Sequence, residues 1–333
     1  MTIRVMHVGL GPIGLGVVRQ VASRAGFRSV GAVDLAPELQ GRDLGDVAGL
    51  ERRLRVKVAA DAAAVLRATK PDAAVLCTSS SLPKVAPQIA TLLKARVPVV
   101  STTEELAYPA GRNRRVARQL DALARRAKVV VVGTGVNPGF AMDALPIALS
   151  AVCARVERVR VERVQDASIR RRPFQAKIGA GLTEAEFQER VAAGSVRHVG
   201  LTESITMLSE ALGLRVDRIT DEIRPRLAER AVKSEFFDVP AGRVCGLEQD
   251  GVGWKGDEAI LTLHMEAYLG APESYDAVTI EGEPPLRMKI AGGIHGDVAT
   301  ASITVNTIPK VLQASPGLHT MRSLALPSFH PGR

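Results

Sequence analysis

IRVMHVGLGPIGLGVVRQVASRAGFRSVGAVD, residues 3–34, begins with a short apolar run that is typical of a buried parallel strand. The motif GLGPIG follows. Its glycines have the GxGxxG spacing that suits a tight turn, a close approach to a pyrophosphate, and close packing of a helix on a strand. Apolar residues then recur at helical spacing, and a second strand over residues 29–33 ends in Asp34, whose carboxylate can bind ribose hydroxyls. The pattern predicts a dinucleotide-binding unit with NAD or NADP as cofactor. The expected cofactor-binding residues of this stretch are Gly9, Leu10, Gly11, Pro12, Ile13 and Asp34.

The composition and charge of the chain narrow the function classes. The 333 residues are enough for two domains, and 46% hydrophobic residues fit a globular protein. The net charge of +9 invites a nucleic-acid interpretation, but the arginines are dispersed and only 3% of residues are aromatic, so solvated helix faces explain the charge better. Three distant cysteines without CxxC spacing predict neither a disulfide framework nor a metal site. No apolar run reaches about 18 residues, and no leader segment is apparent. We therefore expect a cytoplasmic protein with no membrane or nucleic-acid partner.

Alternating strand and helix patterns continue to about residue 135. Strands are expected at residues 56–59, 73–76, 97–100 and 128–132, with helices between them, and a long irregular loop is expected at residues 35–55. This alternation predicts a doubly wound parallel sheet that the strand at residues 128–132 closes. Arg42 in the loop leaves the cofactor open. An arginine beside the ribose can accept the 2′-phosphate of NADP, whereas Asp34 favours NAD, and a plain surface charge is the alternative.

After residue 140 the pattern changes to longer strands with one polar face. Residues 156–164 alternate charged residues with valine, which is typical of a strand with one solvated face. The chain is therefore expected to be an α/β protein with a dinucleotide-binding Rossmann domain over residues 1–140 and an α+β domain with an open mixed sheet over residues 141–298. A last helix within residues 299–325 is expected to pack back on the first domain, and the tail from Leu326 is expected to fray. Further strands are expected at residues 235–239, 259–267, 277–281 and 287–290, and helices at residues 183–193 and 204–212.

Polar residues follow several of the expected strands, at the edge where parallel sheets bind ligands. Glu104 is the best candidate for a general acid or base, because a carboxylate that the cofactor partly desolvates gains proton affinity. The alternative for Glu104 and Glu105 is an acid that only offsets a helix dipole. The hydroxyls after residue 76 can contact the cofactor or cap the next helix, and Asn137 can meet the nicotinamide carboxamide or serve a turn. The cofactor candidates of this group are Thr78, Ser79, Ser80, Thr102 and Asn137.

A basic segment, SIRRRPFQAKIGAGLT at residues 168–183, is the second candidate site. Its cations beside Gln175 can orient a substrate carboxylate, because arginine offers two parallel hydrogen-bond donors. A solvated basic loop is the equally open alternative. The substrate-binding candidates are Arg172, Gln175, Lys177 and Phe140.

Several longer motifs resemble one family. GLGPIG, STTEELAYP, GTGVNPGFAMD, SIRRRPFQAKIGAGLT and GGIHGDVATASITVNTIP followed by PGLHTM together resemble the 2,4-diaminopentanoate dehydrogenase family. That family contains the native amine dehydrogenases and is related to dihydrodipicolinate reductase. The resemblance runs nearly end to end. It implies a homodimer and NAD(P)-dependent oxidative deamination of an amine or a diamino acid such as 2,4-diaminopentanoate. The reverse reaction is the reductive amination of a ketone or aldehyde with ammonia.

The resemblance also implies roles for individual residues. The family's catalytic glutamate falls in the STTEEL motif, so Glu104 is expected to activate the amine and assist water loss. Asn137 and Asn306 fall in family motifs near the cofactor and the substrate. Dihydrodipicolinate reductase itself fits less well, because the paired histidines and the SGT loop of that family are absent from this sequence. The alternatives are an imine or dihydrodipicolinate-type reductase and a non-catalytic NAD(P)-binding protein.

Overall fold

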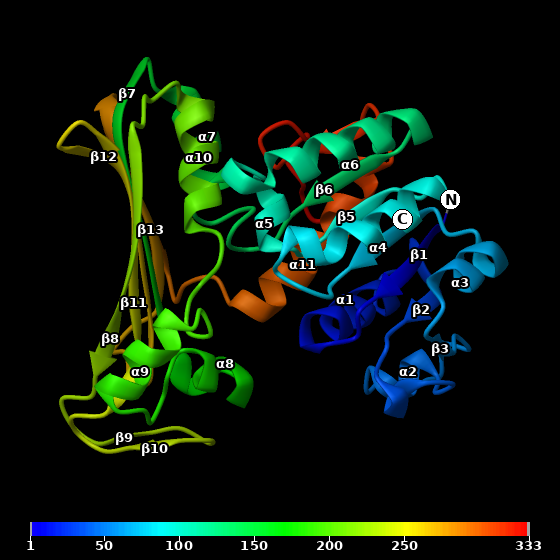
Figure 1. Cartoon of the computed structure of the whole chain (residues 1–333), viewed down its shortest axis with the longest axis horizontal. Coiled ribbons are helices and arrows are strands. Elements are labelled where there is room, and N and C mark those ends of the chain that lie inside the picture. Colours follow the sequence, from blue (N-terminus) through cyan, green and yellow to red (C-terminus); the bar gives the residue numbers. More distant parts are fainter. Residues whose placement is uncertain (1, 332–333) are drawn as a thin grey trace. The chain divides into compact units, whose positions relative to one another are not determined.

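The computed structural model describes residues 2–331, which form two units (Figure 1). Among the described residues, unit 1 comprises residues 2–140 and 295–331, and unit 2 comprises residues 141–294. Within the described part of the chain, no helix is long and apolar enough to cross a bilayer, and no group of three or more His, Cys, Asp and Glu side chains could hold a metal ion.

Unit 1 is built on a seven-stranded parallel sheet with the order β15-β6-β5-β4-β1-β2-β3, which confirms the predicted doubly wound sheet. Short runs rich in valine and alanine form the central strands, because helices bury both of their faces. The prediction that residues 128–132 close the sheet is wrong, because β15 pairs with β6 beyond them. The strands are β1 (Ile3–Val8), β2 (Phe27–Val33), β3 (Val58–Ala59), β4 (Ala73–Leu76), β5 (Val99–Ser101), β6 (Val130–Gly133) and β15 (Gly317–His319).

Helices cover both faces of this sheet. On one face, α1 (Pro12–Ala22) packs against α11 (Gly296–Val311), which also contacts β5 and β6 (Figure 1). The remaining helices of unit 1 are α2 (Leu44–Val47), α3 (Ala62–Thr69), α4 (Leu82–Lys94), α5 (Glu104–Ala107) and α6 (Arg114–Ala127). On the other face, apolar residues of α3 to α6 form one core cluster with Met6 and Leu76, whereas Leu44 of α2 packs in a separate cluster with Val18 of α1.

Residues 35–55 are more ordered than the expected irregular loop. They contain a 3₁₀ turn, Pro37–Leu39, and the short helix α2. The carboxylate of Asp43 caps α2 and accepts hydrogen bonds from the backbone N–H groups of Gly45 at 2.8 Å and Leu54 at 2.9 Å. One acid therefore folds the polar segment back on itself, which the glycine-rich sequence concealed.

Unit 2 contains a six-stranded mixed sheet with the order β14-β13-β7-β12-β11-β8, which confirms the predicted open mixed sheet. The β7–β12 pair is parallel and the other pairs are antiparallel. Strands β8 and β11 are absent from the sequence prediction, and residues 235–239 contribute only β10 (Asp238–Val239), in a short ribbon with β9 (Val232–Lys233). The sheet strands are β7 (Arg155–Asp166), β8 (Arg218–Leu227), β11 (Val244–Lys255), β12 (Glu258–Tyr268), β13 (Tyr275–Glu283) and β14 (Leu286–Ala291).

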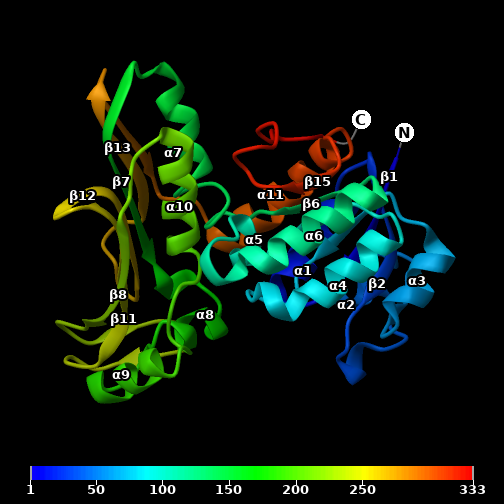
Figure 2. The same ribbon diagram turned by 45° about the horizontal axis from the view of Figure 1, so that its top comes forward.

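The helices of unit 2 lie on one face of its sheet (Figure 2). The buried side of α10 (Leu201–Leu212) packs over β11, where Gly251 and Gly253 leave room for Ile205. The opposite face carries paired charges, such as Arg158 with Glu258 and Glu281, so this side of the mixed sheet is solvated. The other helices are α7 (Ala144–Leu149), α8 (Arg172–Lys177) and α9 (Glu184–Ala192).

Candidate active site

The glycine-rich loop between β1 and α1 has the geometry of a phosphate-binding turn. Gly9 has a φ of +88°, and a Cβ there would lie 2.6 Å from the backbone oxygen of Cys77. A Cβ at Gly14 would lie 2.0 Å from the backbone oxygen of Gly9, so only glycine allows α1 to approach the loop. A Cβ at Gly11 would meet no described protein atom within 4 Å. The backbone at Gly11 is therefore open to a pyrophosphate at the N-terminus of α1.

Asp34 ends β2 and lines a cavity of about 630 Å³, which we call the carboxyl-edge cavity. Its Oδ2 accepts a hydrogen bond from the N–H of Leu10 at 2.6 Å, and its Oδ1 accepts one from the N–H of Ala36 at 2.9 Å. The carboxylate thus joins the glycine-rich loop to the segment after β2, and each oxygen retains a lone pair for a ribose hydroxyl. No lysine or arginine is among the described residues that line the cavity.

Residues of α4 also line the carboxyl-edge cavity, and the sequence prediction missed them. Gln88 and Thr91 reach it from this helix, and the Thr78 hydroxyl donates to Gln88 Oε1 at 2.6 Å. The available signal was two uncharged polar residues three positions apart on a helix whose other polar residues are the lysines Lys84 and Lys94. Thr78 therefore lies where a cofactor candidate was expected, with its orientation fixed by α4.

The serines after β4 do not cap α4. Ser81 is the N-cap residue but makes no side-chain capping bond. The Ser79 hydroxyl accepts the Ser81 N–H at 3.2 Å, and the backbone oxygens of Ser79 and Ser80 accept bonds from the β5–α5 segment. The capping alternative for this stretch is therefore wrong, and the segment instead joins two loops at the carboxyl edge of the sheet.

Glu104 and Glu105 differ in burial and in hydrogen bonding. Glu105 is 5% exposed, and its Oε2 accepts the Leu82 N–H at 2.8 Å, which caps the N-terminus of α4. Glu104 is the first residue of α5 and is partly buried. Glu105 therefore has a structural role as the cap of α4, whereas both acids lie in the first turn of α5, and the catalytic role of Glu104 stays a prediction.

Cys77 lines the carboxyl-edge cavity and lies close enough to Glu104 for the charge of that residue to act on its thiol. Burial raises the pKa of the Cys77 thiol to about 11, a hydrogen bond with Thr102 acts in the opposite direction, and the negative charge of Glu104 raises this pKa further. Both interactions require Thr102 and Glu104 to lie close to the end of β4. The fold thus brings the candidate acid–base residue beside the space that the cofactor would occupy.

The segment after β6 lies next to the same loops. The Thr134 N–H donates to the Ser101 oxygen at 2.8 Å, at the point where β5 ends. Thr134 is 2% exposed, and its hydroxyl has no hydrogen-bond partner among the described residues. Asn137 and Phe140 follow in partly buried positions. Their roles toward the cofactor and the substrate stay predictions.

Asn306 lies elsewhere, at the amino edge of the sheet. Its Oδ1 accepts hydrogen bonds from Arg24 Nη1 at 2.6 Å and from the His330 N–H at 3.2 Å. Arg24 lies between the end of α1 and the start of β2, and His330 packs edge-on against Phe27 with ring centroids 5.5 Å apart. The expected cofactor role of Asn306 is therefore wrong, because its side chain anchors the C-terminal segment. The expected fraying of the tail from Leu326 stays a prediction, and residues 332–333 of that tail lie outside the described residues.

Gln175 in the basic segment of unit 2 is fully buried. Its Nε2 donates to the backbone oxygens of Ser168 at 3.1 Å and Arg170 at 2.7 Å, and its Oε1 accepts from the Ser234 hydroxyl at 2.6 Å. The expected substrate contact of Gln175 is therefore wrong, since its amide is occupied in holding the turn before α8.

Arg172 and Lys177 lie exposed on α8. Lys177 is close enough to His198 for its charge to lower the pKa of that histidine to about 3, although burial is the larger cause. The Nε2 atom of His198 is buried without a partner among the described residues. This part of unit 2 thus combines exposed cations with a neutral imidazole.

Comparisons with known proteins agree with these features. Residues 140–332 match the model of the 2,4-diaminopentanoate dehydrogenase C-terminal domain. The chain is 31% identical to a 2,4-diaminopentanoate dehydrogenase of Acetoanaerobium sticklandii over 98% of this chain and 94% of that protein. It is also similar to the structure of an amine dehydrogenase from Mycobacterium smegmatis, with 29% identity, a TM-score of 0.87, and coverage of 99% of this chain and 98% of that one.

A more distant likeness concerns the fold alone. A dihydrodipicolinate reductase from Paenisporosarcina sp. TG-14 has 16% identity and a TM-score of 0.52, over 96% of this chain and 98% of that one. The higher identities and the domain match decide the family. The chain belongs to the 2,4-diaminopentanoate dehydrogenase family.

Proposed function

We propose that this protein is an NAD(P)-dependent amine dehydrogenase that oxidatively deaminates an amine or a diamino acid such as 2,4-diaminopentanoate. In reverse it aminates a ketone or aldehyde with ammonia. The observation that carries the proposal is the placement of Glu104 beside Cys77 and Thr102, at the carboxyl edge that also holds the glycine-rich loop, in a chain of this family. Membership in the family makes the chain an oxidoreductase acting on a CH–NH2 group.

Glu104 is the residue we assign to proton transfer. When bound, the nicotinamide accepts a hydride from the carbon that bears the nitrogen, or returns it in the reverse reaction. In the amination direction, Glu104 accepts a proton from the ammonium ion and passes it to the carbonyl oxygen as ammonia attacks the carbon. It then accepts a second proton from the nitrogen of the carbinolamine and donates it to the hydroxyl, so that water departs and the iminium remains. One carboxyl group thus serves as base and then as acid, and no further proton carrier is needed.

For the cofactor we propose NAD in preference to NADP. The N–H groups at the start of α1 and the open backbone at Gly11 would hold the pyrophosphate, and Asp34 would bind the ribose hydroxyls. A 2′-phosphate would meet the Asp34 carboxylate in a cavity whose described lining contains no cation, and Arg42 is not among the lining residues. Repulsion between the two anions would then weaken NADP binding.

The substrate carboxylate and the assembly state complete the proposal. We assign Arg172 and Lys177 to a carboxylate of the substrate, because both are exposed cations on α8. We also propose a homodimer, to which the helix-free face of the unit 2 sheet is suited: Arg224 there pairs with Glu222, Glu248 and Asp250, so both signs of charge are present on one surface.

The test follows oxidation of NADH and NADPH by absorbance, with 2-amino-4-oxopentanoate and a panel of simple ketones and aldehydes, each with and without ammonium. Consumption that depends on ammonium supports amine dehydrogenation. Consumption without ammonium would mean carbonyl or imine reduction instead.

The matched variants are Glu104→Gln and Glu105→Gln. We expect Glu104→Gln to lower turnover by about 10²–10⁴-fold while NAD⁺ binding stays, because general acid–base catalysis contributes effects of that size. Glu105→Gln retains an oxygen for the Leu82 N–H, so the folded variant should keep turnover within about tenfold of the parent. Unchanged turnover of Glu104→Gln would refute the assignment of the base.

A further inference from the structure

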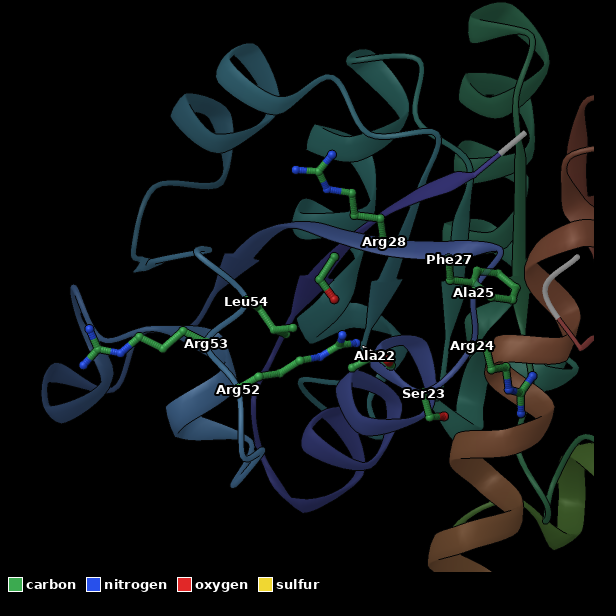
Figure 3. A pocket seen from close by; sticks show the side chains of 10 residues that line it. Ala22, Ser23, Arg24, Ala25, Phe27, Arg28, Arg52, Arg53 and Leu54 are labelled. Carbon is green, nitrogen blue, oxygen red and sulfur yellow. Dashed lines mark hydrogen bonds between the residues drawn. The ribbon is translucent and has the colours of Figure 1, made fainter.

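A second cavity, of about 560 Å³, lies at the amino edge of the same sheet in unit 1 (Figure 3). The end of α1, the start of β2 and residues 52–54 surround it. None of its lining residues lines the carboxyl-edge cavity. We call it the amino-edge cavity, and no part of the proposed reaction uses it.

The charge of this cavity is its unusual property. Its lining includes four arginines and no acidic residue among the described residues. Two of the arginines are already engaged. Arg24 donates to Asn306 Oδ1 and to Gln20 Oε1, both at 2.6 Å, and Arg53 pairs with Asp46 at 3.3 Å. Figure 3 accordingly shows Arg53 directed away from the other lining residues.

Of the other two arginines, only Arg52 keeps its charge for a ligand inside the cavity. Arg28 is exposed, and its side chain leaves β2 on the side opposite to Arg52 and Leu54, so its guanidinium points away from them (Figure 3). Arg52 reaches inward to Ala22 (Figure 3), where its Nη2 donates to the backbone oxygen at 2.7 Å. That single bond to a neutral carbonyl leaves most of the guanidinium N–H donors of Arg52 unused.

A buried hydroxyl adds a directed donor. Ser29 lines the cavity and is 7% exposed, and its Oγ lies 2.9 Å from His7 Nε2. His7 Nδ1 is buried without a partner among the described residues. Orphaned buried N–H groups are rarer than orphaned acceptors, which places the ring proton on Nε2. Ser29 then accepts from His7 and keeps its own O–H for the cavity.

We propose that the amino-edge cavity binds a phosphate-bearing small molecule. Arg52 supplies guanidinium donors that match a phosphate group, and the Ser29 hydroxyl supplies a further donor. The volume is within the range of small-ligand sites, and Leu54 and Phe27 provide apolar wall for an organic part. The inference does not depend on the amine chemistry, because the two cavities share no lining residue.

The experiment titrates the full chain with glucose 6-phosphate by calorimetry in the presence of saturating NAD⁺, which occupies the carboxyl-edge cavity. Inorganic phosphate and glucose are titrated separately. We expect saturable binding of glucose 6-phosphate, with about one molecule per chain, and no binding of glucose. Equal affinity for inorganic phosphate would identify the phosphate group alone as the ligand, which also supports the proposal.

Variants locate the binding. Arg52→Gln should weaken binding at least about tenfold, since it removes a charged donor to phosphate. Arg53→Gln is the matched control and should bind as the parent does, because Arg53 is paired with Asp46 on the outside. Ser29→Ala removes only a hydroxyl and should also weaken binding, so it tests the proposal even if Arg52→Gln fails to fold. Absence of binding by the parent, or equal binding by Arg52→Gln, Ser29→Ala and the parent, would overturn the proposal.

Discussion

The cavities at the two edges of the unit 1 sheet are lined by side chains of opposite charge. The carboxyl-edge cavity, of about 630 Å³, contains the Asp34 carboxylate and no lysine or arginine among its described lining residues. The amino-edge cavity, of about 560 Å³, contains four arginines and no acid among its described lining residues. Both are suited to phosphate-bearing molecules, but the first relies on backbone N–H groups and a helix dipole, whereas the second relies on full charges.

The two cavities also differ in how far the sequence alone can predict them. At the carboxyl edge, the glycine spacing fixes the binding backbone, so the site is visible in the sequence. At the amino edge, Ser29 and Arg52 come from segments that only the fold brings together. Backbone N–H groups are already ordered in the folded protein, whereas a long arginine side chain loses conformational entropy when it binds a ligand. We therefore expect a lower ligand affinity at the amino-edge cavity. Because that affinity depends on full charges, it should also fall more steeply with salt concentration.

His7 offers the largest test of the amino edge. Burial lowers the pKa of His7 from 6.5 to about 4, so this residue binds fewer protons in the folded state than in the unfolded state. Its contribution to stability is therefore full above pH 6.5 and is lost as the pH falls toward 4. Between pH 7.5 and pH 5 the loss should be about 2 kcal/mol. Protonation there would place a further cation beneath an edge that has no described acid in its cavity.

The measurement is hydrogen–deuterium exchange of peptides that cover β1, normalised to the intrinsic exchange rate at each pH. His7→Gln should remove most of the acid-induced loss of protection, because glutamine does not titrate. His319→Gln, outside the strands next to β1, serves as the control. Equal acid sensitivity of the parent and of His7→Gln would show that His7 does not connect protonation to this edge.

Asp34 tests the other half of the comparison. In Asp34→Asn the carboxyl-edge cavity loses its negative charge, and the second oxygen that accepts a backbone N–H is replaced by an amide nitrogen. We expect the Kd for NAD⁺ to rise about tenfold, or about 1.4 kcal/mol, while the Kd for NADP⁺ rises less or falls. Calorimetric titration of both cofactors measures the change in preference.

Glu38→Gln is the control for that experiment, because Glu38 is exposed in the same segment and is not a lining residue of the cavity. If both variants changed the preference for NAD⁺ over NADP⁺ equally, the total negative charge of this segment, and not Asp34 itself, would determine the preference. If neither changed it, Asp34 would only hold the glycine-rich loop.

Much of unit 1 could be predicted from the sequence because its strands are short, apolar and bounded by glycine or helix signals. The strand β4 and the helix α1 follow directly from such patterns. The edge strand β15 did not, because a three-residue strand with one glycine carries no periodicity and is defined only by its partner β6.

In unit 2 the missed strands have physical reasons. β11 contains Gly246, Gly251 and Gly253, which suggest a loop, yet the neighbours require them. A Cβ at Gly246 would lie 2.1 Å from the Ala267 oxygen, and one at Gly251 would lie 3.0 Å from side-chain atoms of α10. These contacts join distant segments, so local sequence could not show that glycine here serves packing in a strand.

The sequence predicted which motifs form the candidate site, but not the role of each residue within them. The STTEEL stretch placed two acids at the correct edge, but only the bond from Glu105 to the Leu82 N–H separates the capping acid from Glu104. Gln175 was assigned to the substrate from the basic segment around it, and Asn306 to the cofactor and substrate cleft from the family resemblance, whereas their partners Ser234 and Arg24 are distant in the chain. Buried amides satisfied by distant groups cannot be recognised from their own neighbourhood.

The smallest expected effect concerns Cys77, which lies in the carboxyl-edge cavity close to Glu104. Because burial raises the pKa of this thiol to about 11, it stays protonated over the working range and does not compete with Glu104 as a base. Cys77→Ser should therefore change turnover by less than about threefold, with the same pH profile between pH 7 and pH 9. Initial rates of the parent and of Cys77→Ser across that range provide the measurement. A limb of the profile that disappears in Cys77→Ser would make the thiol part of the proton transfer, and the carboxyl edge would then no longer depend on carboxylates and backbone dipoles alone.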